Sequence, residues 1–208
     1  MARPETAVNA AERHGRIFTG CARHWALGAL LASVMAAPGV VQTGRTEAQP
    51  ASPEDVEAAY LYNFGKFVRW PEDRRHGPLL FCVAGQRSFA QILTRLVSDE
   101  NIDGRPLDVR LLSRRESPLD CSILFISAAD RGQMEDLLRR VAGRSVLTVS
   151  DIPDFLAHGG IIQFLPMQSH VRFSVNLASA IRNELDLSSE LLKVAASVTG
   201  KPSGGGAR

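Results

Sequence analysis

Short apolar runs that alternate with amphipathic segments constrain the fold of this chain more than any other sequence feature. Residues 79–84 (Leu-Leu-Phe-Cys-Val-Ala) are apolar throughout and lie between Pro78 and Gly85, as is typical of a strand buried on both faces. Further strands are predicted at residues 107–112, 121–126 and 146–149, with helices at 89–97 and 130–141. Strand–helix–strand order predicts βαβ units, and hence a single α/β domain whose mostly parallel central sheet is flanked by helices.

The predicted domain covers residues 54–199 and begins with a helix at 54–69. Its apolar stripe, which should face the core, consists of Val56, Tyr60, Phe64, Phe67 and Val68. Tyr62, Lys66 and Trp70 fall off this stripe and are our candidates for a binding surface. Core packing is the alternative, because it is the commoner role of aromatic side chains at helical spacing.

The C-terminal part of the domain departs from the βαβ pattern. Residues 161–165 and 171–175 are separated by only five residues, so they are predicted to pair as an antiparallel hairpin at one edge of the sheet. Helices are predicted at 176–185 and 188–198. The Gly-rich segment 200–208 is predicted to be a disordered tail. Capping boxes are predicted at Ser88-x-x-Gln91 and Asp130-x-x-Gln133.

Residues 1–48 have the pattern of a secretory signal followed by a linker. Arg13, Arg16 and Arg23 precede an uncharged run at 25–37, and small residues follow it. A transmembrane helix needs about 20 apolar residues, which is longer than this run, although an uncleaved membrane anchor remains the alternative. Two processing sites stay open, one ending at Ala48 and one ending at Ala36. We therefore expect a periplasmic protein.

The charge of the predicted mature domain is balanced. The chain has 24 Lys and Arg against 22 Asp and Glu, and residues 1–48 hold five Arg and three acidic residues. The remainder therefore has 19 residues of each sign, without the basic surplus that is usual in phosphate recognition. We do not expect nucleic acid as a partner.

The cysteines point to a disulfide, and no motif points to catalysis. Cys21 would be removed with the signal, which leaves Cys82 and Cys121 as an even pair in an oxidising compartment. We predict that they form a structural disulfide. The sequence contains neither G-x-S-x-G nor H-E-x-x-H, and its histidines lack metal-ligand spacing. We therefore predict a protein that is not an enzyme and has no cofactor or metal.

Polar residues at strand ends are the remaining candidates for ligand or partner contacts. Ser127 and Asp130 follow one predicted strand, and Ser150 and Asp151 end another, at the edge where open α/β sheets bind ligands. Turn and cap formation is the alternative role of such residues. In the hairpin, Arg172 points away from its apolar neighbours, either into solvent at an edge strand or into a specific contact. Asn176 follows it as a further candidate.

Five blocks of the sequence resemble the YfiR family in the correct order. They are residues 58–71 (AAYLYNFGKFVRWP), 146–151, 159–164, 172–176 and 187–192. The resemblance implies an exported regulatory protein that represses a membrane-bound diguanylate cyclase of the inner membrane by protein–protein binding, and so lowers cyclic-di-GMP signalling. It also implies a homodimer. The alternative is a periplasmic small-ligand-binding or sensor protein that uses the cleft near Ser127 and Ser150.

Overall fold

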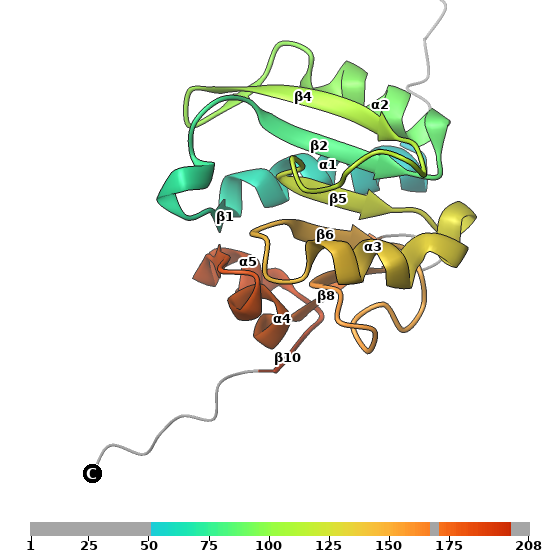
Figure 1. Ribbon diagram of the computed structural model, residues 1–208, viewed down its shortest axis with the longest axis vertical. Coiled ribbons are helices and arrows are strands. Elements are labelled where there is room, and N and C mark those ends of the chain that lie inside the picture. Colours follow the sequence, from blue (N-terminus) through green and yellow to red (C-terminus); the bar gives the residue numbers. More distant parts are fainter. Residues whose placement is uncertain (1–50, 167–170, 201–208) are drawn as a thin grey trace, which may run out of the picture. The chain divides into compact units, whose positions relative to one another are not determined.

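An eight-stranded mixed sheet forms the centre of the molecule (Figure 1). The structure is a computed structural model that describes residues 51–166 and 171–200. The strand order is β10-β8-β7-β6-β5-β2-β4-β3. The strands are β2 (Leu79–Ala84), β3 (Asn101–Ile102), β4 (Arg105–Leu112), β5 (Ile123–Ile126), β6 (Leu147–Ser150), β7 (Ile162–Pro166), β8 (Val171–Asn176) and β10 (Ser197–Thr199). A separate antiparallel pair consists of β1 (Val68–Arg69) and β9 (Asp186–Leu187).

The direction of the strands confirms the predicted fold class. β4, β2, β5, β6 and β7 run parallel to one another, whereas β3 pairs with β4 in antiparallel and β7 pairs with β8 as an antiparallel hairpin. The hairpin does not form the edge of the sheet, however, because β10 pairs in parallel with β8. Arg172 is exposed on an inner strand, so its predicted place on an edge strand was wrong.

Helices cover both faces of the parallel sheet. They are α1 (Pro53–Phe67), α2 (Arg87–Val97), α3 (Met134–Val141), α4 (Leu177–Arg182) and α5 (Ser189–Val194), with short 3₁₀ helices η1 (Glu72–Arg74) and η2 (Ala128–Gln133). Phe81 and Val83 of β2 point into the larger core, which α1 and α2 cover, whereas Cys82 and Ala84 point into a second core under α3. Figure 1 shows α3 in front of the sheet and α1 behind it. Continuous apolar strands are therefore required, since each side chain meets a core.

The first helix has its ends where the sequence provides signals for them. Ser52 accepts a hydrogen bond from the Asp55 backbone N–H and Asp55 accepts one from the Ser52 backbone N–H, so that a capping box precedes Pro53 at the first helical position. The buried face consists of Ala58, Leu61, Phe64 and Gly65. The predicted stripe was wrong in part, because Phe67 is 38 % exposed.

The chain beyond α1 returns to the core. Trp70, which follows β1, is only 4 % exposed and belongs to the larger core. Trp70 is therefore not on an exposed surface, and its role in binding stays a prediction.

Two predicted helix starts and one predicted helix end also differ from the structure. α2 begins at Arg87 with Gln86 as its N-cap, rather than in a box at Ser88. Asp130 lies inside η2, and α3 starts after Gln133. α5 ends at Val194, because Ala195 is extended and the chain continues into β10, whose backbone groups bond to β8.

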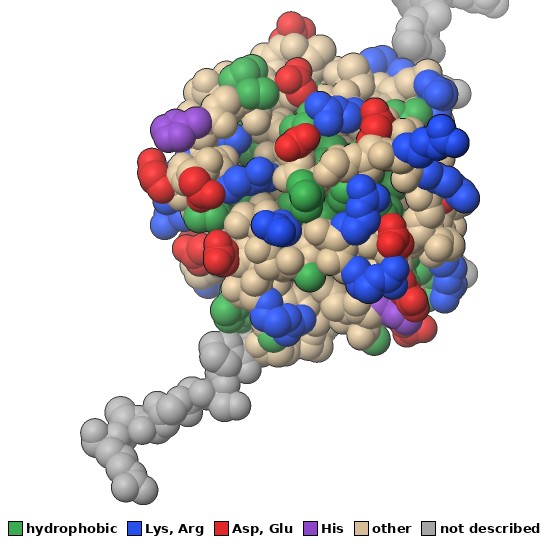
Figure 2. All heavy atoms as spheres, viewed as in Figure 1, with side chains coloured by type: hydrophobic (Ala, Val, Ile, Leu, Met, Phe, Trp, Pro, Cys, Tyr) green, Lys and Arg blue, Asp and Glu red, His purple; other side chains and the backbone are tan. Residues whose placement is uncertain are grey.

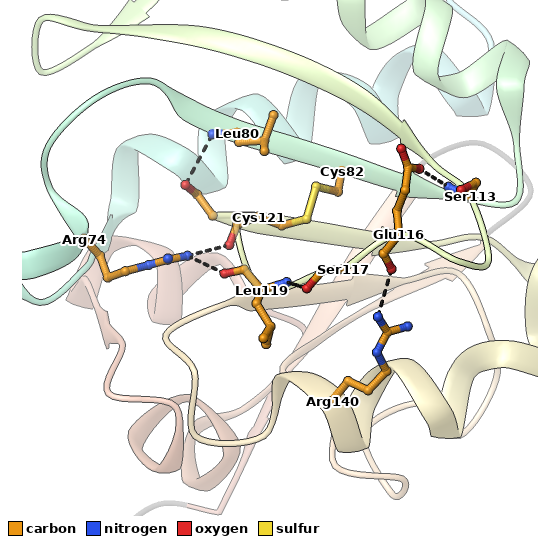
Figure 3. The surroundings of a disulfide bond; sticks show 10 residues. Arg74, Leu80, Cys82, Ser113, Glu116, Ser117, Leu119, Cys121 and Arg140 are labelled. Carbon is orange, nitrogen blue, oxygen red and sulfur yellow. Dashed lines mark hydrogen bonds between the residues drawn. A yellow bond between two sulfur atoms is a disulfide. The ribbon is translucent and has the colours of Figure 1, made fainter.

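The disulfide between Cys82 and Cys121 is confirmed (Figure 3). Both cysteines are fully buried, and their Cα atoms are 5.8 Å apart. Cys82 lies in the middle of β2, and Cys121 lies two residues before β5 rather than in a strand as predicted. Arg74 Nη2 donates to the carbonyl oxygens of Leu119 and Cys121, at 3.1 and 2.9 Å. The bridge and this arginine together fix the entry of the chain into β5.

The predicted terminal segments of the chain lie almost entirely outside the described residues. The predicted signal and linker at 1–48 lie outside the described residues, as does all of the predicted tail except Gly200. No helix in residues 51–166 or 171–200 is both long enough and apolar enough to cross a membrane.

Candidate functional site

The predicted polar residues meet at the carboxyl edge of the parallel strands. The chain leaves β2 through α2 toward β4 on one side, and the later strands β5, β6 and β7 follow on the other side. The ends of β2 and β5 therefore flank a point where the direction of strand addition reverses, and such points are the usual ligand sites of open α/β sheets. Ser127 follows β5 at this point, and Gln86 follows β2.

A chain of hydrogen bonds connects the residues at this point to α1. Ser127 is 1 % exposed, and its hydroxyl donates to Gln86 Oε1 at 3.0 Å. Gln86 Nε2 in turn donates to Glu54 Oε1 of α1, at 2.6 Å. Ser127 Oγ also accepts from the backbone N–H of Ala129. The first turn of α1 is thus tied to the ends of β2 and β5.

Ser150 and Asp151 also have partners within the protein. The Ser150 hydroxyl is fully buried, donates to the Ile126 carbonyl oxygen at 2.6 Å and accepts from the Ile152 backbone N–H at 3.0 Å. Asp151 Oδ1 accepts from the Ala128 backbone N–H at 2.7 Å. These bonds hold the loop after β5 against the end of β6, which corresponds to the alternative role of these residues in turn and cap formation.

Asp130 approaches the backbone that follows β2. Its carboxylate accepts a hydrogen bond from Gln133 Nε2 and lies 3.5 Å from Arg114 Nη2. Gly85 has a φ of +100°, and a Cβ atom at this position would lie 2.6 Å from Asp130 Cβ. Only glycine fits here, because both the backbone conformation and the space exclude a side chain.

Glu57 is a half-buried acid that the sequence did not single out. Burial raises its pKa to about 7, and the nearby carboxylates of Asp151 and Glu54 add to the shift. Burial also raises the pKa of Asp151, although the hydrogen bond from the Ala128 backbone N–H lowers it in part. The edge is therefore acidic and partly desolvated. Glu57 follows Glu54 at helical spacing and therefore lies on the same side of α1. Nothing in the sequence showed that this side of α1 covers the edge of the sheet.

A second feature is an apolar groove formed by α1, β8 and α5. It has a volume of about 350 Å³. Its lining residues are Tyr60, Asn63, Phe64, Phe67, Phe173, Glu190, Leu191 and Val194. Phe67 is 38 % exposed and Val194 is 66 % exposed. Large apolar side chains that remain in solvent at a groove are typical of protein contact surfaces. We call this surface the α1–α5 groove.

The other predicted contact residues lie apart from both places or support the fold. Tyr62 donates from its hydroxyl to Glu100 Oε2 at 2.5 Å, and Lys66 Nζ lies 3.9 Å from the centre of the Tyr62 ring. Asn176 caps α4, accepting from the Ser179 backbone N–H at 3.1 Å, and its amide donates to the Leu156 carbonyl oxygen at 3.2 Å. The roles of Tyr62, Lys66 and Arg172 in binding stay predictions.

Comparison with known protein families decides what kind of chain this is. The model of the YfiR/HmsC-like family matches residues 54–196, well over half of the chain and nearly all of its described part. The chain belongs to the YfiR/HmsC-like family. Members of this family are periplasmic regulators of cyclic-di-GMP signalling, and they are regulatory rather than catalytic.

Several solved structures are similar to the YfiR/HmsC-like domain in fold. One is a conserved domain protein from Vibrio cholerae O1 biovar El Tor, with a TM-score of 0.51 and 9 % sequence identity. The similarity covers 71 % of this chain and 60 % of the Vibrio chain. This chain thus spans less than two thirds of that protein, and the likeness concerns the fold alone.

Charged side chains of both signs are mixed on the surface of the domain. Figure 2 shows Lys and Arg interspersed with Asp and Glu on the face turned to the viewer. Within residues 51–166 and 171–200, no group of three or more His, Cys, Asp or Glu side chains is placed to bind a metal ion. The α1–α5 groove is an apolar feature of this YfiR/HmsC-like domain that is open to a partner.

Proposed function

We propose that this protein is exported to the periplasm and represses a membrane-bound diguanylate cyclase by binding the periplasmic part of that cyclase. The α1–α5 groove is the observation that carries the proposal, together with family membership. Repression by binding requires a higher affinity for the inactive state of the cyclase than for the active state. Cyclic-di-GMP synthesis would then rise when the repressor is released.

The chemistry of the groove suits an apolar segment of a partner protein. Phe64, Phe173 and Leu191 form its floor and are buried, whereas Phe67 and Val194 stand at its rim. Glu190 is the single charged side chain among its lining residues. An apolar side chain of the cyclase would therefore displace water from this surface without burying an unpaired charge.

The test is a pull-down with the tagged full-length chain from the native periplasm and inner membrane, combined with measurement of cyclic-di-GMP. We expect recovery of a membrane diguanylate cyclase and a rise of cyclic-di-GMP after deletion of the gene. Val194→Asp and Phe67→Asp should weaken the contact by roughly tenfold or more, because each would bury a carboxylate against apolar surface. Cyclic-di-GMP should rise in both variants as it does after deletion.

Two exposed apolar residues outside the groove supply matched controls. Ile181→Asp on α4 matches Val194→Asp, since Ile181 is 53 % exposed, and Leu96→Asp on α2 matches Phe67→Asp, since Leu96 is 39 % exposed. Both controls should still bind the cyclase. If deletion leaves cyclic-di-GMP unchanged and no membrane partner is recovered, repression is refuted.

The predicted homodimer offers a different occupant for the same groove. Sedimentation of the purified protein shows whether a second copy of this chain, rather than the cyclase, occupies the groove. If Phe67→Asp and Val194→Asp convert a dimer to a monomer while the cyclase is still recovered, the groove joins two copies of this chain and our assignment of the cyclase contact is wrong.

A further inference from the structure

One edge of the central sheet is open along most of β4. This strand has eight residues, and β2 pairs in parallel with Leu107–Leu112 on its inner side. On its outer side, β3 pairs only with Arg105 and Pro106. No other strand of the described residues bonds to β4, and Figure 1 shows it at the upper margin of the sheet. Every second residue of Leu107–Leu112 therefore turns its backbone N–H and C=O groups away from the sheet.

The larger core is also incomplete at this edge. Val109 and Leu111 pack against that core, and their register partners on β2 are Phe81 and Val83. Phe81 and Val83 are fully buried. Val109 and Leu111 are only half-buried. A further strand beside β4 would therefore cover apolar surface that now meets water.

The opposite face of the open segment carries two charges of opposite sign. Asp108 and Arg110 are both exposed, and neither forms an ion pair within the described residues. Hydrogen bonds from Ser113 and, to a lesser degree, the charge of Arg110 lower the pKa of the Glu116 carboxyl, so Arg110 has an acid nearby without contacting it. Charged side chains on an edge strand usually discourage pairing with other chains. Alternating signs nevertheless allow a register that sets opposite charges across from each other.

Antiparallel pairing with a second β4 provides such a register. A two-fold axis through Val109 sets Asp108 of each copy opposite Arg110 of the other. It sets Leu107 opposite Leu111 in the same way. Residues that lie opposite each other share a face of the sheet, so the charges meet in solvent and the apolar side chains meet beside the core. A parallel pair in register, or an axis through Asp108 or Arg110, would set like charges opposite each other.

We propose that two copies of this chain join through the outer edges of their β4 strands, in antiparallel register about Val109. The central sheets of the two copies then form one continuous sheet. Residues 107–111 take part, and all of them lie beyond the positions that β3 occupies. The contact is closed about its two-fold axis, because each copy fills the open edge of the other. It uses none of the residues of the α1–α5 groove and does not depend on the repressor function.

Sedimentation of the full-length chain over a range of concentrations tests the dimer. Arg110→Asp and Asp108→Arg should each weaken dimerisation roughly tenfold or more, because either change turns two attractive cross-strand pairs into repulsive ones. Arg172→Asp reverses the charge of an exposed arginine on an inner strand and should leave the dimer intact. Val194→Asp in the α1–α5 groove should also leave it intact.

A mixture of the two charge variants gives a sharper result. Arg110→Asp carries two acidic side chains on its open edge, and Asp108→Arg carries two basic ones, so a mixed pair has opposite charges at both cross-strand positions. We expect the mixture to form heterodimers about as readily as the wild type dimerises, although each variant alone is mainly monomeric. The double variant Asp108→Arg/Arg110→Asp should dimerise like the wild type for the same reason. It keeps the test decisive if a single variant fails to fold.

Hydrogen exchange locates the interface on the chain. The outward backbone N–H groups of residues 107–111 should exchange slowly in the wild-type dimer, because each donates to the other copy, and quickly in the monomeric Arg110→Asp variant. The N–H groups of β2 should be protected in both, since β2 lies inside the sheet of each copy.

Four results would refute the β4 interface. They are a wild type that sediments as a monomer at every concentration, dimers of Arg110→Asp as stable as those of the wild type, no association of the mixed variants, and rapid exchange throughout residues 107–111 in the wild-type dimer. Loss of the dimer in Val194→Asp but not in Arg110→Asp would assign the second copy to the α1–α5 groove instead. Recovery of the cyclase is measured separately, so a failure of the repressor function would not alter these results.

Discussion

At the scale of single residues, Glu57 contributes a part of the domain's stability that depends on pH. Its pKa is about 7 in the folded protein, against an ordinary value of 4.5 for a glutamate in the unfolded chain. The folded state therefore holds the proton more tightly, and the contribution of Glu57 to stability is fully present below pH 4.5 and is lost as the pH rises through 7. Asp151, whose pKa is also raised by burial, acts in the same direction.

Glu57→Gln should remove most of this dependence. At pH 8 we expect the variant to be more stable than the wild type by about 1–2 kcal/mol, a value reduced for the partial exposure of this side chain. At pH 4.5 the two proteins should differ far less. Urea unfolding at both pH values measures the difference, with Asp99→Asn, at an exposed position, as a control that keeps the wild-type dependence. If the free energy of unfolding changed with pH by the same amount in Glu57→Gln and in the wild type, the role of Glu57 would be contradicted.

The residue scale also shows what the sequence could and could not predict about the candidate site. Ser127, Ser150 and Asp151 were predicted to lie near one another because parallel strands end at one edge, and they do. Their hydrogen bonds within the protein could not be predicted, since they depend on where the following loops turn. Glu57 and Gln86 were missed because the packing of the first turn of α1 on this edge is a tertiary contact without a local signature.

At the scale of elements, the disulfide links β2 to the segment before β5 across 39 residues. Because the bridge limits the freedom of the unfolded chain, the double variant Cys82→Ala/Cys121→Ala should lose about 4 kcal/mol on the chain-entropy model. Urea unfolding of the variant and of the wild type measures the loss. Wild type reduced in urea and refolded under reducing conditions should show a similar loss, which separates the bridge from the change to alanine. A loss below about 1 kcal/mol would mean that the native pairing of β2 with β5 suffices without the bridge.

The elements that the sequence predicted well are those with a strong local pattern. β2 and β5 lie between two cores, and this burial produces the continuous apolar runs by which they are predicted. The inner face of α1 was rotated from the prediction, because its orientation follows from contacts far away in sequence. The Phe64 ring lies 4.9 Å from the Phe173 ring, and Gly65 allows α1 to approach Ile102.

The end of the domain shows the same limit of local patterns. Residues 195–198 continue an apolar spacing that suits a helix, but the backbone of β10 bonds to β8 instead. Ala196 N donates to the Phe173 carbonyl oxygen at 2.8 Å, and Ser197 Oγ donates to Ser174 Oγ at 2.8 Å. Tertiary hydrogen bonds thus override a weak helical preference at the last elements.

At the scale of the whole molecule, two cores share one sheet. Phe125 of β5 contributes to the core under α1 and α2, and Leu124 beside it contributes to the core under α3. Loss of either core would expose one face of the same strands to water, so neither core should persist without the other. The disulfide reinforces this coupling, since Cys82 and Cys121 both belong to the core under α3.

The domain should therefore unfold in one cooperative step. We expect the thermal transitions followed by far-ultraviolet circular dichroism and by the near-ultraviolet signal of the aromatic core to coincide, and the calorimetric enthalpy to equal the van't Hoff enthalpy. The aromatic signal reports the core under α1, where Phe64, Phe89 and Phe164 lie, whereas secondary structure reports both sides of the sheet. A near-ultraviolet transition at a lower temperature than the far-ultraviolet one would show that this core melts first. In that case the α1–α5 groove would belong to a separately unfolding layer rather than to a rigid domain.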